Sequence, residues 1–262
     1  MAYPDFSELS FGYCFLRELE TRYTYGGRFP KAPDFITQHD EATKGYDVEV
    51  ALDGAVPLFI QLKRSEVMFG DTAREFLSVW FPSRPAFRMN LHRSPKHAYA
   101  QHTALQALES SGEQVIYATS QIETPAELSA HSSSGTVISS ASAMFSPNEI
   151  QLPDLTSPHH VSFYDHQSWA VLFSDEGGHF QRRFPSAEKW LSQLTAKPRS
   201  REDNNAAMRK VAHSIRSNPE WEFANNDFIR FSDGNPVIEA AILAYFFLDV
   251  QLTFVKPPKQ QG

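Results

Sequence analysis

The chain reads GYDVEVAL at residues 45–52 and VPLFIQLK at residues 56–63, with Asp53-Gly54 directly after the first run. Both runs have the apolar and β-branched composition of strands, and Asp-Gly between two such runs is a strong hairpin signal. In an antiparallel hairpin, Asp47 would open one strand and Lys63 would close its neighbour. The two side chains are therefore expected at the same end of the pair, which predicts a polar site there.

The residue types at this end suit hydrolysis of a phosphodiester. The Asp47 carboxylate can bind a divalent cation, and the Gln61 side-chain oxygen and the Leu62 carbonyl can add hard oxygen ligands. Lys63 can hold the attacking water beside the phosphate. Because Gln61 is neutral, a second carboxylate is needed. Glu49 can supply it, since it lies two residues beyond Asp47 on the same face of the strand.

Glu20 is another candidate for that second carboxylate. Ser7 is a plausible N-cap, and a helix is predicted over residues 8–24. At helical spacing Glu20 falls in the middle of one apolar stripe, where a carboxylate is expected to have a positively charged partner. Two readings stay open, a metal ligand or a partner for an arginine. The predicted stripe consists of Leu9, Tyr13, Leu16, Leu19 and Tyr23.

A basic segment follows the predicted site. The chain carries a net charge of −7, yet residues 61–96 contain seven basic and three acidic residues. A local excess of positive charge suits a groove that meets phosphate. The candidate nucleic-acid contacts are Arg84, Arg88, Arg93, Lys96 and Gln101. His102, beside them, is interpreted as a satisfied surface or core histidine rather than a group that approaches the phosphate. His159 and His160 are interpreted as strand-end packing.

Composition limits the class of protein. A chain of 262 residues with 41% hydrophobic residues can bury a full core. The single Cys14 excludes an internal disulfide framework. No signal peptide is recognised at the N-terminus, and the apolar stretch 237–255 is too polar for a membrane span. We expect a cytoplasmic protein without a membrane partner, in which 237–255 forms a buried helix and then a strand.

The remaining pattern predicts an α+β fold. Strands are expected at residues 86–92, 114–119, 160–164, 170–174 and 179–184, with at most a brief strand near Val137. Helices are expected at residues 96–110, 124–130, 186–195, 202–217 and 236–249. Residues 64–84 read as irregular, with a short helix around 72–80.

The run Gly45-Tyr46-Asp47 followed by Gln61-Leu62-Lys63 resembles the PD-(D/E)XK nuclease superfamily, in the Gln-x-Lys variant of Mrr-like restriction endonucleases. The resemblance covers residues 8 to about 120. It implies a restriction-endonuclease-like core at 1–150, in which a mixed central sheet is flanked by helices. Residues 151–262 would be a mainly helical extension that packs on the core or binds a partner, including a second copy of the chain.

The resemblance also implies an activity, namely cleavage of DNA with Mg²⁺ or Mn²⁺, as in restriction or phage defence. Asp47, Gln61 and Lys63 would be catalytic, and Glu20 is a possible ligand because the first helix of this superfamily often lends a glutamate. Two alternatives stay open: an inactive nuclease-fold scaffold or sensor, and an RNA substrate. The chain has no Walker phosphate loop, no Gly-x-Ser-x-Gly elbow and no His-Glu-x-x-His motif.

Overall fold

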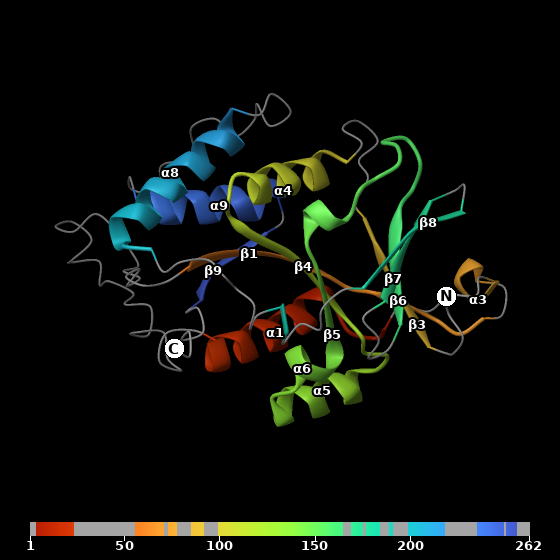
Figure 1. Cartoon of the computed structure of the whole chain (residues 1–262). Coiled ribbons are helices and arrows are strands. Elements are labelled where there is room, and N and C mark those ends of the chain that lie inside the picture. The colour runs from red at the N-terminus through yellow and green to blue at the C-terminus, as the bar shows by residue number, and fades with distance from the viewer. Residues whose placement is uncertain are drawn as a thin grey trace, which may run out of the picture. The chain divides into compact units, whose positions relative to one another are not determined.

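The computed structural model of the chain describes residues 4–23, 56–70, 73–77, 85–91, 99–164, 169–174, 177–183, 189–190, 199–217, 235–248 and 250–255. It is an α+β fold with one mixed and one antiparallel sheet plus helices, as the sequence pattern predicts (Figure 1). Among the described residues, no helix combines the length and apolar character needed to cross a membrane.

The chain forms two compact units. The first comprises Met1–Glu18, Leu62–Ala107 and Ile116–Gln193, and the second comprises Leu19–Gln61, Leu108–Val115 and Leu194–Gly262. The predicted division near residue 150 stays a prediction. Strands from both sides of that position share one sheet in the first unit.

That sheet is antiparallel and has the strand order β2-β3-β6-β7-β8, of which Figure 1 labels β3, β6, β7 and β8. Its strands are β2 (Glu66–Met68), β3 (Ala86–Asn90), β6 (His160–Tyr164), β7 (Trp169–Ser174) and β8 (Gly177–Arg183). Four of the five match predicted strands. The exception is β2, a three-residue strand too short for the alternating pattern to be recognised.

Alternation along the strands gives this sheet two different faces. One face is apolar and includes Val67, Phe87 and Phe163, which are cross-strand neighbours and are all buried. The rings of Phe87 and Phe163 stack with centroids 5.8 Å apart, and Phe145 of β5 (Ser142–Phe145) packs on Phe163 at 5.4 Å. This face therefore carries the main core of the first unit.

The other face combines a small apolar cluster with charged residues. The cluster contains Met68, Ala86, Val171 and Phe173, and Phe76 of the short helix α3 (Arg74–Leu77) packs against it. Arg88, Asn90, His160 and Ser162 share this face by strand alternation.

The mixed sheet has the strand order β5-β4-β1-β9, with β4 at Gln114–Ser120, β1 at Val56–Lys63 and β9 at Gln251–Val255. Strand β1 is thus an interior strand, and β9 pairs antiparallel with Val56–Ile60. The predicted hairpin partner, residues 46–52, lies outside the described residues together with the turn at Asp53-Gly54. The hairpin stays a prediction, whereas the strand at 56–63 is confirmed.

Helix α1 (Glu8–Tyr23) confirms the first predicted helix, and Ser7 caps it by accepting a hydrogen bond from the Ser10 N–H at 3.0 Å. The predicted apolar stripe is wrong in its first half, because Leu9 and Tyr13 are 82% and 64% exposed, whereas Leu19 of the same stripe is fully buried. The buried face includes Phe11 and Phe15, whose rings pack with centroids 5.8 Å apart.

The helix predicted at residues 124–130 is confirmed, whereas a short helix stands where a brief strand was predicted near Val137. Thr124 and Glu127 form a capping box at the start of α5 (Pro125–Ser134), and α6 (Val137–Ala141) follows before β5. The Ile138 N–H in the first turn of α6 donates to the buried Glu18 carboxylate at 3.1 Å. A carboxylate from α1 therefore stabilises this helix start.

The second unit contains α8 (Arg201–Arg216), α9 (Pro236–Leu248) and β9. The prediction that residues 237–255 form a helix and then a strand is confirmed. Arg216 and Glu239 form an ion pair between α8 and α9. In the same unit Arg199 donates to both carboxylate oxygens of Glu113, at 3.1 and 2.9 Å.

Candidate functional site

The end of β1 carries the residues on which the sequence prediction depends. Gln61 is fully buried, and Leu62 and Lys63 are partly exposed. By strand alternation Gln61 and Lys63 lie on one face of β1 and Leu62 on the other. The Leu62 side chain packs against Gly12 of α1, where an added Cβ would come within 2.5 Å of the leucine Cδ1. Gly12 therefore allows the helix to approach this strand end closely.

The chain just after Lys63 is held by two separate groups of contacts. The Arg64 N–H donates to the Glu8 carboxylate at 2.9 Å, and the Arg64 guanidinium donates to the Phe6 carbonyl at 3.0 Å. The Ser65 hydroxyl donates to the Ser120 carbonyl at the end of β4, in a fully buried position. The two residues directly after Lys63 are therefore held, Arg64 by Glu8 and Phe6 and Ser65 by the end of strand β4.

Several predicted site residues cannot be placed relative to Lys63. Asp47, Glu49, Arg84, Arg93 and Lys96 lie outside the described residues, and the structure describes the backbone but not the side chain of Glu20. Their predicted roles stay predictions. Within the described part of the chain, no three His, Cys, Asp or Glu side chains form a group able to hold a metal ion.

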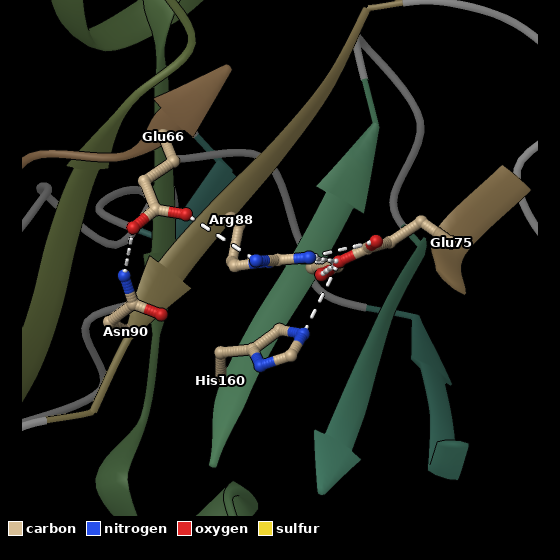
Figure 2. Close-up of polar contacts among 6 residues, drawn as sticks. Glu66, Glu75, Arg88, Asn90 and His160 are labelled. Atoms are coloured by element: carbon tan, nitrogen blue, oxygen red, sulfur yellow. Dashed lines mark hydrogen bonds and ion pairs between the residues drawn. The ribbon is translucent and has the colours of Figure 1, made fainter. Parts of the chain in front are cut away.

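Arg88, one of the predicted DNA contacts, instead binds two carboxylates on the second face of the five-stranded sheet (Figure 2). Its Nε and Nη2 donate to Glu75 at 2.8–3.0 Å, and its Nη1 donates to Glu66 at 3.5 Å. The Arg88 side chain is 11% exposed and that of Glu75 is 0% exposed. This geometry commits the guanidinium to a largely buried ion pair and argues against the predicted DNA contact.

Three more polar side chains complete this network, which we call the Arg88 network (Glu66, Glu75, Arg88, Asn90, His160 and Ser162). Ser162 donates to Glu75 at 2.7 Å, and Asn90 donates its amide N–H to Glu66 at 2.6 Å. The His160 Nε2 lies 3.2 Å from the same Glu75 oxygen, and the ring stacks on Phe173 with an 8° interplanar angle. Figure 2 shows His160 and Arg88 meeting Glu75 from neighbouring strands.

The electrostatics of Glu75 follow from these contacts. Burial raises the pKa of the Glu75 carboxyl, but hydrogen bonds from His160, Ser162, its own backbone and Arg88 outweigh burial and lower the pKa to about 2. Glu75 is therefore ionised at any physiological pH. Because its three side-chain donors, Arg88, His160 and Ser162, lie on strands β3 and β6, the network attaches this short helix to the sheet.

A second polar cluster lies along one face of α4 (Ala100–Ser110) and includes His102. The His102 Nε2 lies 2.9 Å from the Ile150 carbonyl, which can only accept, so this nitrogen carries the proton. Nδ1 then accepts from the Tyr117 hydroxyl at 2.9 Å. Burial lowers the pKa of His102 and raises that of Tyr117. The prediction of a satisfied histidine is confirmed.

The same helix holds the loop that precedes β6. Gln106 donates to the carbonyls of Pro147 and Ile150 at 3.2 and 3.1 Å. Tyr99, just before α4, donates to the Ser157 carbonyl at 2.6 Å and accepts from the His159 N–H at 2.8 Å. These hydrogen bonds satisfy backbone carbonyl and N–H groups of the loop. A role in holding the loop in place therefore accounts for the polar side chains of this cluster.

Asp154 and His159 order the loop from within. The Asp154 carboxylate accepts from the N–H groups of Ser157 and Thr156, both at 2.6 Å, and these bonds hold its pKa well below its usual range. The buried His159 ring places Nε2 at 2.8 Å from the Asp154 carbonyl. This confirms that His159 packs at the strand end, as its position in the sequence suggested.

Gln101, the remaining predicted contact, lies in the first turn of α4 and is partly exposed. Sequence reasoning missed the partners of Arg88. An arginine on an alternating strand predicts an acidic neighbour, but Glu66, Asp71 and Glu75 were equally plausible from their positions in the chain. The pairing of β2 with β3 places Glu66 directly opposite Arg88 and so explains the contact between these two residues. This pairing could not be read from the sequence.

The chain matches no family model, no curated protein and no solved structure.

Proposed function

We propose that this protein is a metal-dependent endonuclease that hydrolyses DNA phosphodiester bonds, built on a restriction-endonuclease-like core. The observation that carries the proposal is the end of β1. There Gln61 and Lys63 share one face of an interior strand, and Lys63 stands where the strand emerges from the core. This is the placement that Gln-x-Lys requires if its polar groups are to converge beside a phosphate.

The order of elements agrees with such a core. Helix α1 precedes β1, and helix α4 leads into β4, which is the neighbour of β1 in the mixed sheet. The order expected from the family resemblance is a helix, about three meandering strands, a second helix and a further strand. The two strands that follow β1 in the chain, β2 and β3, belong to the five-stranded sheet, so the agreement is limited to α1, β1, α4 and β4. Many α+β domains share parts of this order, so it supports the proposal without carrying it.

The donor set suits a hard cation. Asp47, together with Glu49 or Glu20, would supply the carboxylates, and Gln61 and the Leu62 carbonyl would supply neutral oxygens. When bound, Mg²⁺ or Mn²⁺ would activate water and neutralise charge on the phosphate. Lys63 would donate hydrogen bonds to the attacking water and to the phosphate oxygens as their negative charge increases.

One observation favours a second candidate, an inactive nuclease-fold scaffold or sensor. The residue at the middle ligand position is a neutral and fully buried glutamine, so the site carries one negative charge fewer than a site with a carboxylate there. A site with weaker metal affinity would suit a protein that binds nucleic acid or a protein partner without cutting. Metal binding therefore separates the two candidates.

The test is cleavage of supercoiled plasmid with Mg²⁺ or Mn²⁺ by the parent, by Lys63→Ala and by the control Lys210→Ala. Lys210 is an exposed lysine of α8. The proposal expects nicking or linearisation by the parent and the control, and at least a 100-fold loss in Lys63→Ala. Equal cleavage by the parent, Lys63→Ala and Lys210→Ala would contradict the proposal. No cleavage and no Mg²⁺ binding by the parent would support the scaffold instead.

A further inference from the structure

We infer that Glu8 is a positioning residue for Lys63: its carboxylate fixes the peptide that follows the lysine and so holds the lysine at the end of β1. This inference rests on the proposed function, because Lys63 is taken as the group that acts on the phosphate. Glu8 and Lys63 are 55 positions apart in the sequence, and the contact that joins their surroundings comes from the fold.

The contact lies where the strand needs a partner. Strand β1 ends at Lys63, so the next N–H, that of Arg64, lies beyond the ladder of β1. The Glu8 carboxylate accepts from it at 2.9 Å. A hydrogen bond to a charged acceptor is about twice as strong as a neutral one. The peptide directly after Lys63 is thus held by the Glu8 carboxylate.

The helix dipole alone does not explain Glu8. An acidic residue in the first turn of a helix is favourable wherever its side chain points. Here the N-terminal N–H of Ser10 is already satisfied by Ser7, at 3.0 Å, and the Glu8 carboxylate turns to a different segment. The hydrogen bond to Arg64 therefore gives Glu8 a second role besides its interaction with the helix dipole, and the loss of this bond can be measured separately.

Two further contacts attach the end of β1 to helix α1 and to the residues just before it. The Arg64 guanidinium reaches back to the Phe6 carbonyl at 3.0 Å, and Leu62 packs on Gly12 one turn along from Glu8. The residues on both sides of Lys63 therefore contact α1. Since strand neighbours alternate, the Lys63 side chain leaves β1 on the face opposite Leu62. Without the Glu8 bond, this strand end loses its attachment closest to the lysine.

The experiment compares Glu8→Ala with Glu8→Gln in the plasmid assay. The glutamine oxygen can still accept from the Arg64 N–H, so Glu8→Gln should keep most of the activity. Glu8→Ala removes the acceptor, and we expect kcat to fall by about tenfold or more with KM changed less than twofold, because small misplacements of a reacting group are costly. Asp5→Ala is the matched control, since Asp5 is an exposed carboxylate just before α1.

A double-mutant comparison separates positioning from general destabilisation. In a Lys63→Ala background, Glu8→Ala should cause no further loss of the residual cleavage, because there is no lysine left to position. A purely structural role predicts the same fractional loss in both backgrounds. A metal-ligand role for Glu8 predicts that Glu8→Gln loses activity as Glu8→Ala does. Either result would overturn the inference.

A measurement independent of cleavage keeps the inference testable if the parent does not cut DNA. Lysines are labelled by reductive ¹³C-methylation, and the Lys63 signal is assigned as the one missing in Lys63→Arg. We expect a distinct Lys63 signal in the parent and in Glu8→Gln that moves to the exposed-lysine envelope in Glu8→Ala. An unchanged Lys63 signal in folded Glu8→Ala would refute positioning, whereas absent cleavage with the expected shift would refute only the nuclease.

Discussion

Replacement of Glu75 by glutamine is expected to destabilise the first unit strongly and to change how its stability depends on pH. Glu75→Gln keeps the size of the side chain but removes the charge that faces Arg88. The Arg88 side chain is 11% exposed, and its guanidinium would then face a neutral amide at position 75 and the Glu66 carboxylate at 3.5 Å. A largely buried cation would then lack its main partner.

Two independent arguments give the size of the effect. Removing one partner of a buried ion pair costs about 3–5 kcal/mol. The second argument uses the pKa of Glu75, which falls from its ordinary value of 4.5 to about 2. Each pKa unit corresponds to about 1.4 kcal/mol, so the folded state favours ionised Glu75 by about 3 kcal/mol. The two values agree, and either is a large part of the stability of a typical domain.

The sign of the pH dependence follows from the lowered pKa. A carboxyl with a depressed folded-state pKa stabilises fully above its unfolded value and loses that contribution as the pH falls toward the folded value. For Glu75 the window runs from pH 4.5 down to about pH 2. Over this whole window the parent should lose about 3 kcal/mol more than Glu75→Gln, which has no group to titrate there, and about 2 kcal/mol of this difference should appear by pH 3.

Urea unfolding followed by circular dichroism at pH 7, 4.5 and 3 measures both effects. Glu202→Gln is the control, because Glu202 is an exposed carboxylate in the first turn of α8 and should change the free energy of unfolding by about 0.5 kcal/mol or less. A loss below about 1 kcal/mol for Glu75→Gln at pH 7 would refute the reasoning. So would parallel pH profiles of parent and variant.

Three further changes test other parts of the fold. Gly112 has a φ of +96° with open space around it. Gly112→Ala should therefore lower the free energy of unfolding by about 1–2 kcal/mol through backbone strain alone, as measured by urea unfolding. An unchanged free energy of unfolding would contradict this backbone conformation. Thr124→Ala removes the N-cap of α5 and should cost about 1 kcal/mol in the same assay, with Thr103→Ala on the exposed side of α4 as control. Burial lowers the pKa of His102, so the free energy of unfolding of the parent should decrease as the pH falls below 6.5. His102→Gln should lose less of its free energy of unfolding between pH 7.5 and 5.5, and equal losses would argue against a neutral His102.

Most elements could be predicted because their sequences carry local signals. The helix and strand at residues 236–255 are marked by an apolar run with a polar break, and the structure places α9 and β9 there. Strands β6 and β7 have dense apolar content, and Thr124-Pro125 marks the start of α5. These signals act within a few residues, so they do not depend on the rest of the fold.

The face of α1 could not be predicted because its sequence carries two apolar stripes. Leu9 and Tyr13 follow helical spacing, and so do Phe11 and Phe15. Periodicity identifies a helix but does not say which stripe meets the core. The structure buries the phenylalanines and leaves Leu9 and Tyr13 exposed. The choice depends on tertiary partners such as Leu62, which packs at Gly12.

The candidate site was predictable only where its residues are consecutive. Gln61, Leu62 and Lys63 are fixed relative to one another by the strand itself, and the strand is confirmed. The roles of Glu8 and of Arg88 depend on partners more than ten residues away, which no local pattern specifies. Glu8 contacts a segment 56 residues further along, and Arg88 contacts a helix 13 residues earlier.

The charge of the basic segment illustrates why counting residues is a weak guide to where phosphate binds. The sum over residues 61–96 is positive, and it includes Arg88 with both of its carboxylate partners. A guanidinium that is buried against two carboxylates contributes no positive potential to the surface, and together the three side chains lower the local charge. The Arg64 guanidinium donates to the Phe6 carbonyl just before α1, and this neutral acceptor leaves the positive charge of Arg64 in place. If DNA is bound near β1, its affinity must therefore come from Lys63 and from basic residues other than Arg88. This makes correct placement of Lys63, and the contacts that fix it, more important than the total charge of the segment.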